Sequence, residues 1–123
     1  MAWNLIADRP IYLQLMEEIE LRVVTGVYGP GEKLPSVRDL AAEAAVNPNT
    51  MQRALAELES TGVVNTQRTS GRFVTQDAEL LESYRKRLAE QYIQEFLKKV
   101  EPLGYPPETV LEMVKQIRQE GNG

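Results

Sequence analysis

Two short helical patterns separated by only a few residues restrict the fold of this chain more than any other feature. The first covers residues 37–45 and begins after Ser36, a residue type that favours the N-cap position. The second begins at Asn47-Pro48 and ends at Gly62, because asparagine suits an N-cap and proline suits the first helical position. Two helices joined by so short a turn are typical of a helix-turn-helix motif.

After Gly62 the pattern changes from helical to strand-like. Residues 63–67 and 72–75 are rich in β-branched side chains, and residues 69–71 between them form a turn signal. We expect a short hairpin here, and because two strands alone are marginally stable, it must pack on the helices. A hairpin directly after a helix-turn-helix is a wing. Residues 1–76 are therefore predicted to form a winged helix-turn-helix domain.

Helices are also predicted on both sides of this motif. Residues 10–26 have an apolar face at helical spacing, and the charged residues of that helix, Arg22 among them, fall mostly on its other faces. Residues 77–101 and 108–119 form a helical pair after the wing.

The helical pair carries an apolar stripe too long for it to cover alone, so residues 77–123 are predicted to be a two-helix C-terminal dimerisation unit. The expected dimer contacts are Leu81, Tyr84, Leu88, Tyr92, Phe96, Val110 and Val114. The expected fold class is mainly α with a small β-hairpin, a winged helix-turn-helix domain followed by this unit.

The composition excludes several classes of function. The chain of 123 residues has no cysteine and no histidine, which removes thiolate and imidazole metal sites and the commonest general base. It has no glycine-rich phosphate loop and no nucleophile–base pair, so neither an enzyme nor a cofactor or metal site is expected. No apolar run approaches the length of a membrane span, which predicts a cytoplasmic protein without a membrane partner.

The net charge of −4 argues mildly against a nucleic-acid partner. Residues 1–76 and residues 77–123 each carry a net charge of −2, so the total does not separate the two parts. The distribution is more informative, because the local field matters more than the sum. Four basic residues fall on the surface where DNA would bind: Arg38, Arg53, Arg68 and Arg72.

Short motifs occur in a fixed order between residues 10 and 62: Pro10-Ile11-Tyr12, Gly26, Pro30-Gly31, Leu34-Pro35-Ser36, Arg38, Leu40-Ala41, Thr50, Leu58-Glu59 and Gly62. Together they resemble the DNA-binding domain of the GntR-type bacterial transcription regulators. The short tail and the phrase Asn-Pro-Asn-Thr at residues 47–50 resemble the YtrA-like subfamily. This resemblance implies that the tail dimerises.

Winged-helix docking would place the N-terminal part of the second motif helix in the major groove. Amide side chains there suit adenine edges, and arginine suits guanine or phosphate. The expected DNA contacts are Ser36, Arg38, Asn47, Asn49, Thr50, Gln52, Arg53, Arg68, Ser70 and Arg72. Of these, Ser36 and Asn47 are expected mainly as helix caps. The alternative for Arg38 is a surface ion pair, for example with Glu43, and the alternative for the wing arginines is a solvated turn.

The chain departs from the family pattern in charge. Relatives often carry basic residues at the positions of Pro48 and Gln52 and at the wing tip, whereas this chain has neutral residues there. The recognition helix is therefore expected to read bases mainly through neutral groups, with Arg53 as its charged contact.

The expected function is that of a sequence-specific transcription regulator. We expect a homodimeric repressor that binds a two-fold symmetric operator in double-stranded DNA. The alternative is a winged-helix protein–protein interaction module without DNA binding. A small-molecule effector of unknown identity is left open.

Overall fold

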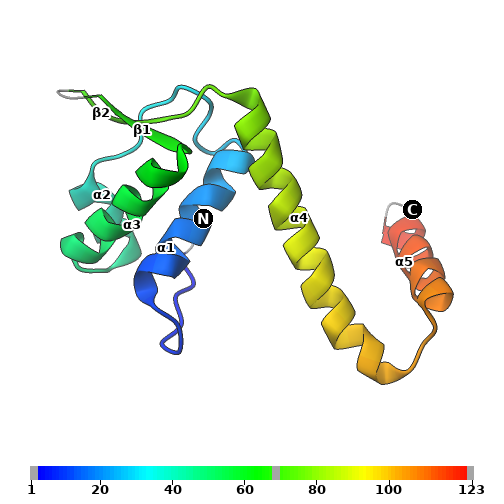
Figure 1. Cartoon of the computed structure of the whole chain (residues 1–123). Helices are drawn as coiled ribbons and strands as arrows, with labels where there is room; N and C mark the ends of the chain where they lie inside the picture. The colour runs from blue at the N-terminus through cyan, green and yellow to red at the C-terminus, as the bar shows by residue number, and fades with distance from the viewer. Residues whose placement is uncertain (1–2, 68–69, 122–123) are drawn as a thin grey trace. The chain divides into compact units, whose positions relative to one another are not determined.

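The computed structural model describes residues 3–67 and 70–121, and this part of the chain is mainly helical with one two-stranded hairpin (Figure 1). The expected fold class is confirmed, and the ends of the predicted elements differ by one or two residues from those observed. The elements in order are α1 (Ile11–Val24), α2 (Val37–Ala44), α3 (Pro48–Thr61), β1 (Val64–Gln67), β2 (Gly71–Val74), α4 (Ala78–Val100), the short 3₁₀ helix η1 (Glu101–Leu103) and α5 (Pro107–Gly121).

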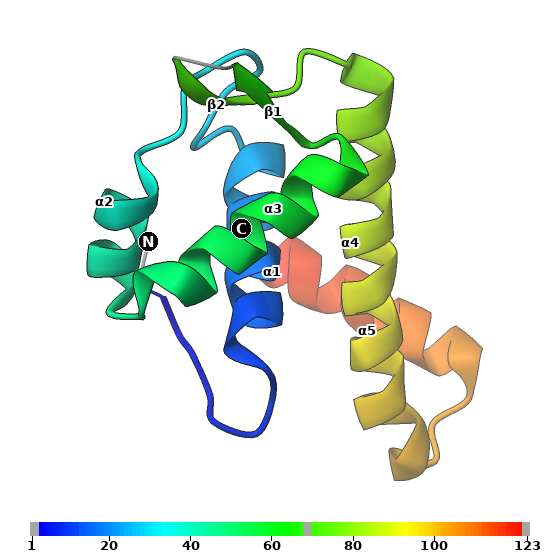
Figure 2. The ribbon, with the colours of Figure 1, turned by 60° about the vertical axis from the view of Figure 1, so that its left-hand side comes forward.

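The core of the winged domain lies where α3 crosses α1 (Figure 2). Leu15 and Ile19 of α1, Leu40 of α2, and Met51 and Leu58 of α3 are fully enclosed, with 0% of their surface exposed. Their spacing within each helix places them on one face. Burying each such side chain contributes roughly 1.5–3 kcal/mol, so this cluster fixes the position of α3.

The wing consists of the antiparallel pair β1 and β2, with a third extended segment along the outer edge of β2. In this segment, residues 31–34, the carbonyl of Glu32 accepts from the N–H of Val74 at 2.9 Å. The N–H of Leu34 donates to the carbonyl of Arg72, also at 2.9 Å. The prolines and glycines of the connector predict only a turn, so this third segment is a finding of the structure. It gives a marginal two-stranded hairpin a second neighbour.

The turn between α2 and α3 depends on an alanine in the left-handed region. Ala45 has a φ of 57° and a ψ of 47°, and it is the only non-glycine residue with positive φ in the described part of the chain. The N–H groups of Ala45 and Val46 donate to the carbonyls of Ala42 and Ala41, which ends α2. A Cβ is crowded in this conformation, at a cost of roughly 1–2 kcal/mol.

Ala45→Gly is expected to raise the free energy of unfolding by about 0.5 kcal/mol, because relief of the strain exceeds the extra entropy cost of glycine. The matched control is Ala42→Gly, at an exposed position inside α2, which is expected to lose about 1 kcal/mol. Urea denaturation of the full chain, followed by circular dichroism, measures both. Equal losses in the two variants would contradict the role given to the left-handed turn.

The chain divides into two compact units, residues 1–85 and residues 86–123, so the division falls inside α4. The first turns of α4 belong to the winged unit. Leu81 and Tyr84 are half-buried there and pack against the core of that unit. These two expected dimer contacts are thus partly covered by their own chain.

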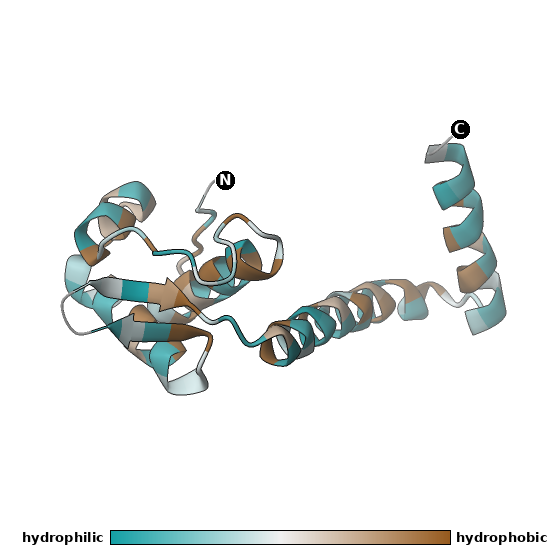
Figure 3. Cartoon of the chain, turned by 90° about the horizontal axis from the view of Figure 1, so that it is seen from above, coloured by the Kyte–Doolittle hydropathy of each residue, from teal (hydrophilic) through white to brown (hydrophobic). Residues whose placement is uncertain are grey.

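The second unit contains the rest of α4, η1 and α5, and it leaves much apolar surface exposed. Apolar segments recur along both helices (Figure 3). Val110 is buried, with 8% of its surface exposed, so it too is covered by its own chain. The large exposed apolar residues are Tyr92, Ile93, Phe96, Leu97, Leu103, Tyr105, Leu111, Met113, Val114 and Ile117. Across residues 3–67 and 70–121, the structure contains no helix long and apolar enough to cross a bilayer.

Candidate nucleic-acid interface

The first turns of α3 present polar side chains on the face opposite the buried stripe. Met51 is fully buried, whereas Asn49, Gln52 and Arg53 are exposed and Thr50 is half-buried. This separation follows from the rotation of about 100° per residue along a helix. The face therefore offers two amides, a hydroxyl and a guanidinium, the groups that pair with base edges.

Ser36 and Asn47 cap the two helices of the motif, as the sequence predicts. The Oγ of Ser36 accepts from the N–H of Asp39 at 3.1 Å, and the Oδ1 of Asn47 accepts from the N–H of Asn49 at 2.8 Å. Pro48 occupies the first turn of α3. Both capping side chains are exposed, so the capped helix ends face solvent.

Arg38 is exposed at the start of α2. The alternative expected for it was an ion pair with Glu43, but Glu43 is instead paired with Arg22. Among the described residues, no carboxylate lies within ion-pair distance of Arg38. Its charge is therefore carried at the surface, in the first turn of the first motif helix.

A hollow of about 580 Å³ between the start of α2 and the wing brings together three expected contacts, Ser36, Ser70 and Arg72. Lys33 lines the same hollow, and the sequence analysis did not single it out. A Cβ added to Gly71, whose φ is 104°, would lie 3.0 Å from the Cε of Lys33. The glycine thus leaves room for the lysine side chain near the loop end of the wing, where Gly71 pairs with Gln67. One signal in the sequence could have indicated Lys33: it is a basic residue directly before the family motif Leu34-Pro35-Ser36.

Arg72 is less available to a ligand than the sequence implies, because Glu59 of α3 pairs with it. The Nε of Arg72 donates to the Glu59 carboxylate. Hydrogen bonds from Thr66 and from Arg72 hold the pKa of Glu59 below its ordinary value. Arg72 therefore ties β2 to α3. Arg68, the other expected wing contact, lies outside the described residues.

A second hollow, of about 620 Å³, joins the starts of α1 and α3. Asn49, Thr50 and Arg53 line it together with Tyr12. The Cζ of Arg53 lies 3.6 Å from the centre of the Tyr12 ring, which is a cation–π contact. The sequence placed Tyr12 in the predicted helix of residues 10–26 and in the motif Pro10-Ile11-Tyr12, without a contact partner. Periodicity identifies a face but not its partner, so this contact could not be predicted.

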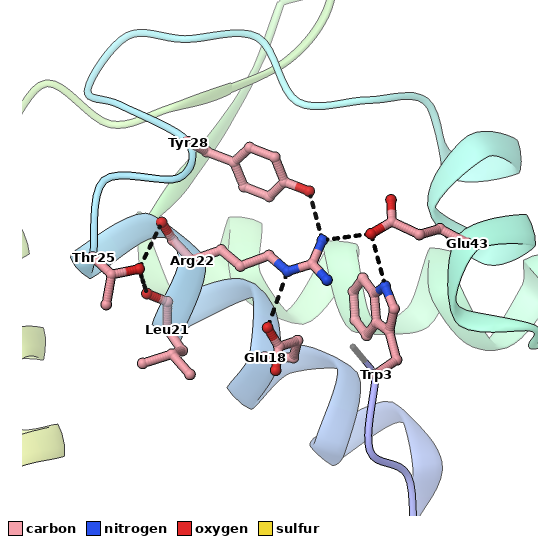
Figure 4. Close-up of polar contacts among 7 residues, drawn as sticks. All are labelled: Trp3, Glu18, Leu21, Arg22, Thr25, Tyr28 and Glu43. Atoms are coloured by element: carbon pink, nitrogen blue, oxygen red, sulfur yellow. Dashed lines mark hydrogen bonds and ion pairs between the residues drawn. The ribbon is translucent and has the colours of Figure 1, made fainter. Parts of the chain in front are cut away.

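A polar cluster around the buried Arg22, with Trp3, Glu18, Tyr28 and Glu43, joins α1 to α2 (Figure 4). The Nη1 of Arg22 donates to Glu43 at 2.8 Å and to the Tyr28 hydroxyl at 3.0 Å, and its Nε donates to Glu18 at 3.0 Å. The Trp3 Nε1–H donates to Glu43 at 3.0 Å, and the guanidinium lies 4.2 Å from the Trp3 ring centre. We call these five residues the Arg22 cluster.

The expectation that Arg22 lies on an outer face of its helix was wrong, since only 3% of it is exposed. Burial alone would lower the pKa of Arg22, but hydrogen bonds with Glu43, Tyr28 and Glu18 outweigh it and raise the pKa above its ordinary value. Hydrogen bonds from Arg22 and then Trp3 lower the pKa of Glu43. The cluster is therefore ionised and holds α2, the first helix of the motif, against α1.

Comparison with known proteins places this arrangement in a family. The model of the bacterial regulatory proteins of the gntR family matches residues 11–74. The transcriptional repressor YtrA of Bacillus subtilis is 33% identical over 119 residues, which cover 95% of this chain and 91% of YtrA. A GntR family transcriptional regulator from Listeria monocytogenes superposes with a TM-score of 0.83 at 38% identity, covering 91% of this chain and 98% of that one.

A solved structure with DNA also matches the winged domain. The DNA-binding domain of AraR in complex with operator ORE1 is 27% identical, with a TM-score of 0.53, over 61% of this chain and 94% of that one. These relatives are regulators, which confirms that the chain is not an enzyme. Since the family model covers the motif and wing and YtrA matches nearly the whole length, the chain belongs to the GntR family of bacterial transcription regulators, in its YtrA-like group.

Proposed function

We propose that this regulator is a cytoplasmic homodimeric repressor that binds a two-fold symmetric operator in double-stranded DNA. The observation that carries the proposal is the exposed polar face of α3, formed by Asn49, Gln52 and Arg53 on a rigid core. The solved complex of AraR with an operator supports operator binding as the proposed activity. The similarity to the repressor YtrA supports repression rather than activation.

On this proposal α3 enters the major groove through its first turns. Asn49 and Gln52 read adenine edges, and Arg53 reads a guanine edge or a phosphate. Arg38 and Lys33 are exposed and supply phosphate contacts, while Arg72 braces the wing through Glu59. Ser36, Asn47, Thr50 and Ser70 add neutral contacts, and Arg68 stays a predicted wing contact.

The proposed dimer forms through the second unit. In that unit, Phe96 is 37% exposed, Val114 is 44% exposed and Leu111 is 63% exposed, and all three line an apolar hollow of about 590 Å³. A second copy placed by two-fold symmetry would cover this surface with the same residues. The proposed dimer interface keeps four of the expected contacts: Leu88, Tyr92, Phe96 and Val114. Leu81, Tyr84 and Val110 contribute mainly within their own chain.

The test is binding of the full chain to a labelled DNA fragment from upstream of its own gene, measured by fluorescence anisotropy over a salt series. With about six phosphate contacts per dimer, the affinity should fall roughly 1,000-fold between about 50 and 200 mM salt. A shuffled fragment of the same length should bind more weakly at every salt concentration. No binding to either fragment at low salt would contradict the proposal and favour a protein–protein interaction module.

Gln52→Ala is expected to reduce discrimination at one operator position by roughly 5- to 150-fold, because a bidentate amide–adenine pair is worth about 1–3 kcal/mol. Competition with operators substituted one base pair at a time measures this. Ser60→Ala, an exposed substitution in the last turn of the same helix, is the matched control and should leave every preference unchanged. Unchanged preferences in Gln52→Ala would remove this residue from the reading surface.

A further inference from the structure

The contact between Tyr12 and Arg53 lies on the surface proposed to read bases. Tyr12 is in the first turn of α1, and Arg53 is in the second turn of α3. The Arg53 Cζ is 3.6 Å from the ring centre, well inside the range of about 6 Å over which cation–π attraction operates. Asn49 and Thr50 line the same hollow as this pair. The stack is therefore continuous with the neutral side chains proposed to contact bases.

The stack orients the guanidinium without neutralising it. Arg22 and Arg72 are each paired with a carboxylate, but among the described residues none lies within ion-pair distance of Arg53. All five N–H donors of arginine lie in the guanidinium plane, so a ring against its face leaves these donors available at the edges. A free arginine side chain has about 2 kcal/mol of rotamer entropy to lose on binding, and a stacked one has already lost part of it.

We propose that Tyr12 is a positioning residue for DNA recognition: its ring holds the Arg53 guanidinium in the orientation in which its edge meets a guanine or a phosphate. This inference rests on the proposed function and deepens it. It assigns to α1, which is outside the helix-turn-helix itself, a part in base preference. It also gives the neutral recognition helix a way to use its single outward-facing arginine with little loss of entropy.

The test compares four single variants and one double variant of the full chain on the operator fragment and on single-base variants of it. Tyr12→Phe keeps the ring and should bind within about twofold of the unchanged chain. Tyr12→Leu keeps apolar volume but removes the π face, and its operator affinity should fall about fivefold. Arg53→Lys should show a similar loss, because an ammonium cannot present the planar fork. Arg53→Ala should fall about tenfold and lose preference at the same base pair.

The readout specific to positioning is the coupling between the two residues. Adding Tyr12→Leu to Arg53→Ala should cost less than about twofold further, because Tyr12 acts through Arg53. A purely structural role for Tyr12 predicts instead that the two losses multiply and that base preference is unchanged, which would overturn the inference. Arg53 is exposed on α3, so Arg53→Lys should leave the fold intact. It therefore tests the orientation of the guanidinium even if Tyr12→Leu folds poorly. Full retention of base preference in Arg53→Lys would also overturn it.

Failure of this inference can be told apart from failure of the proposed function. If the unchanged chain does not bind its upstream DNA at low salt, the proposed function fails, and this inference fails with it. If the unchanged chain binds specifically but the two variants Tyr12→Leu and Arg53→Lys keep its affinity and preference, only the positioning role is lost.

Discussion

Val114→Asp is expected to separate the proposed homodimer into monomers and to lower operator affinity by at least about 100-fold. The valine is 44% exposed and lines the apolar hollow of the second unit. A carboxylate there would be desolvated by a second copy without a partner of opposite charge. Because two linked recognition helices bind with a high effective concentration, a monomer loses that gain even though α3 is unchanged.

Gln116→Asp is the matched control for this prediction. It places the same aspartate in the same helix, about 200° away around the helix axis from Val114. Light scattering coupled to size-exclusion chromatography gives the mass, and fluorescence anisotropy gives the affinity. The proposed dimer surface would be contradicted if the Val114→Asp variant were still a dimer. It would also be contradicted if the chain without any substitution were a monomer at micromolar concentration.

Arg22→Met is expected to lower the free energy of unfolding by about 3 kcal/mol. Methionine fills much of the volume but leaves the Tyr28 hydroxyl and the Glu18 carboxylate without their donor, and Glu18 is only 18% exposed. Glu43 is 46% exposed and can be solvated, which keeps the loss at the lower end for a broken buried ion pair. Arg22→Lys keeps the charge but cannot reach all three acceptors at once, so its loss should be intermediate.

The control for Arg22 is the surface pair of Arg85 with Glu82, whose side chains are 65% and 57% exposed. Arg85→Met should cost less than about 1 kcal/mol, since exposed pairs contribute little. Urea denaturation measures both variants on the same scale. Similar losses in the two variants would show that the Arg22 cluster contributes no more than a solvated pair.

Local signals were enough to predict the helices and the hairpin. Ser36, Asn47 and Pro48 start helices for reasons that lie within the next few residues, and Gly62 ends one at a φ of 86°. The apolar spacing of α3 likewise identified its buried face, and that of α1 identified its buried apolar residues but not the buried Arg22. The outward face of α3 followed from the same spacing, because a buried stripe at one side defines the exposed side.

Contacts between distant residues could not be predicted in this way. The bond from Trp3 to Glu43 joins residues 40 positions apart, and the pair of Arg72 with Glu59 joins two elements. No local pattern distinguishes such arginines from solvated ones. The apolar stripe of α4 shows the same limit, since its spacing is regular but Leu81 faces the core of its own chain and Phe96 is exposed. Spacing shows which face is apolar, not what covers it.

The Arg22 cluster also determines how the motif responds to acidity. The pKa of Glu43 is held below its ordinary value, so its contribution to stability is present above the ordinary carboxyl range and is lost only as pH falls through the lowered pKa. The pKa of Arg22 is raised, so this residue keeps its proton under all ordinary conditions. Protonation near neutral pH therefore cannot release α2 from α1 through this cluster. On the proposed function, loss of DNA binding near neutral pH would have to come from other groups.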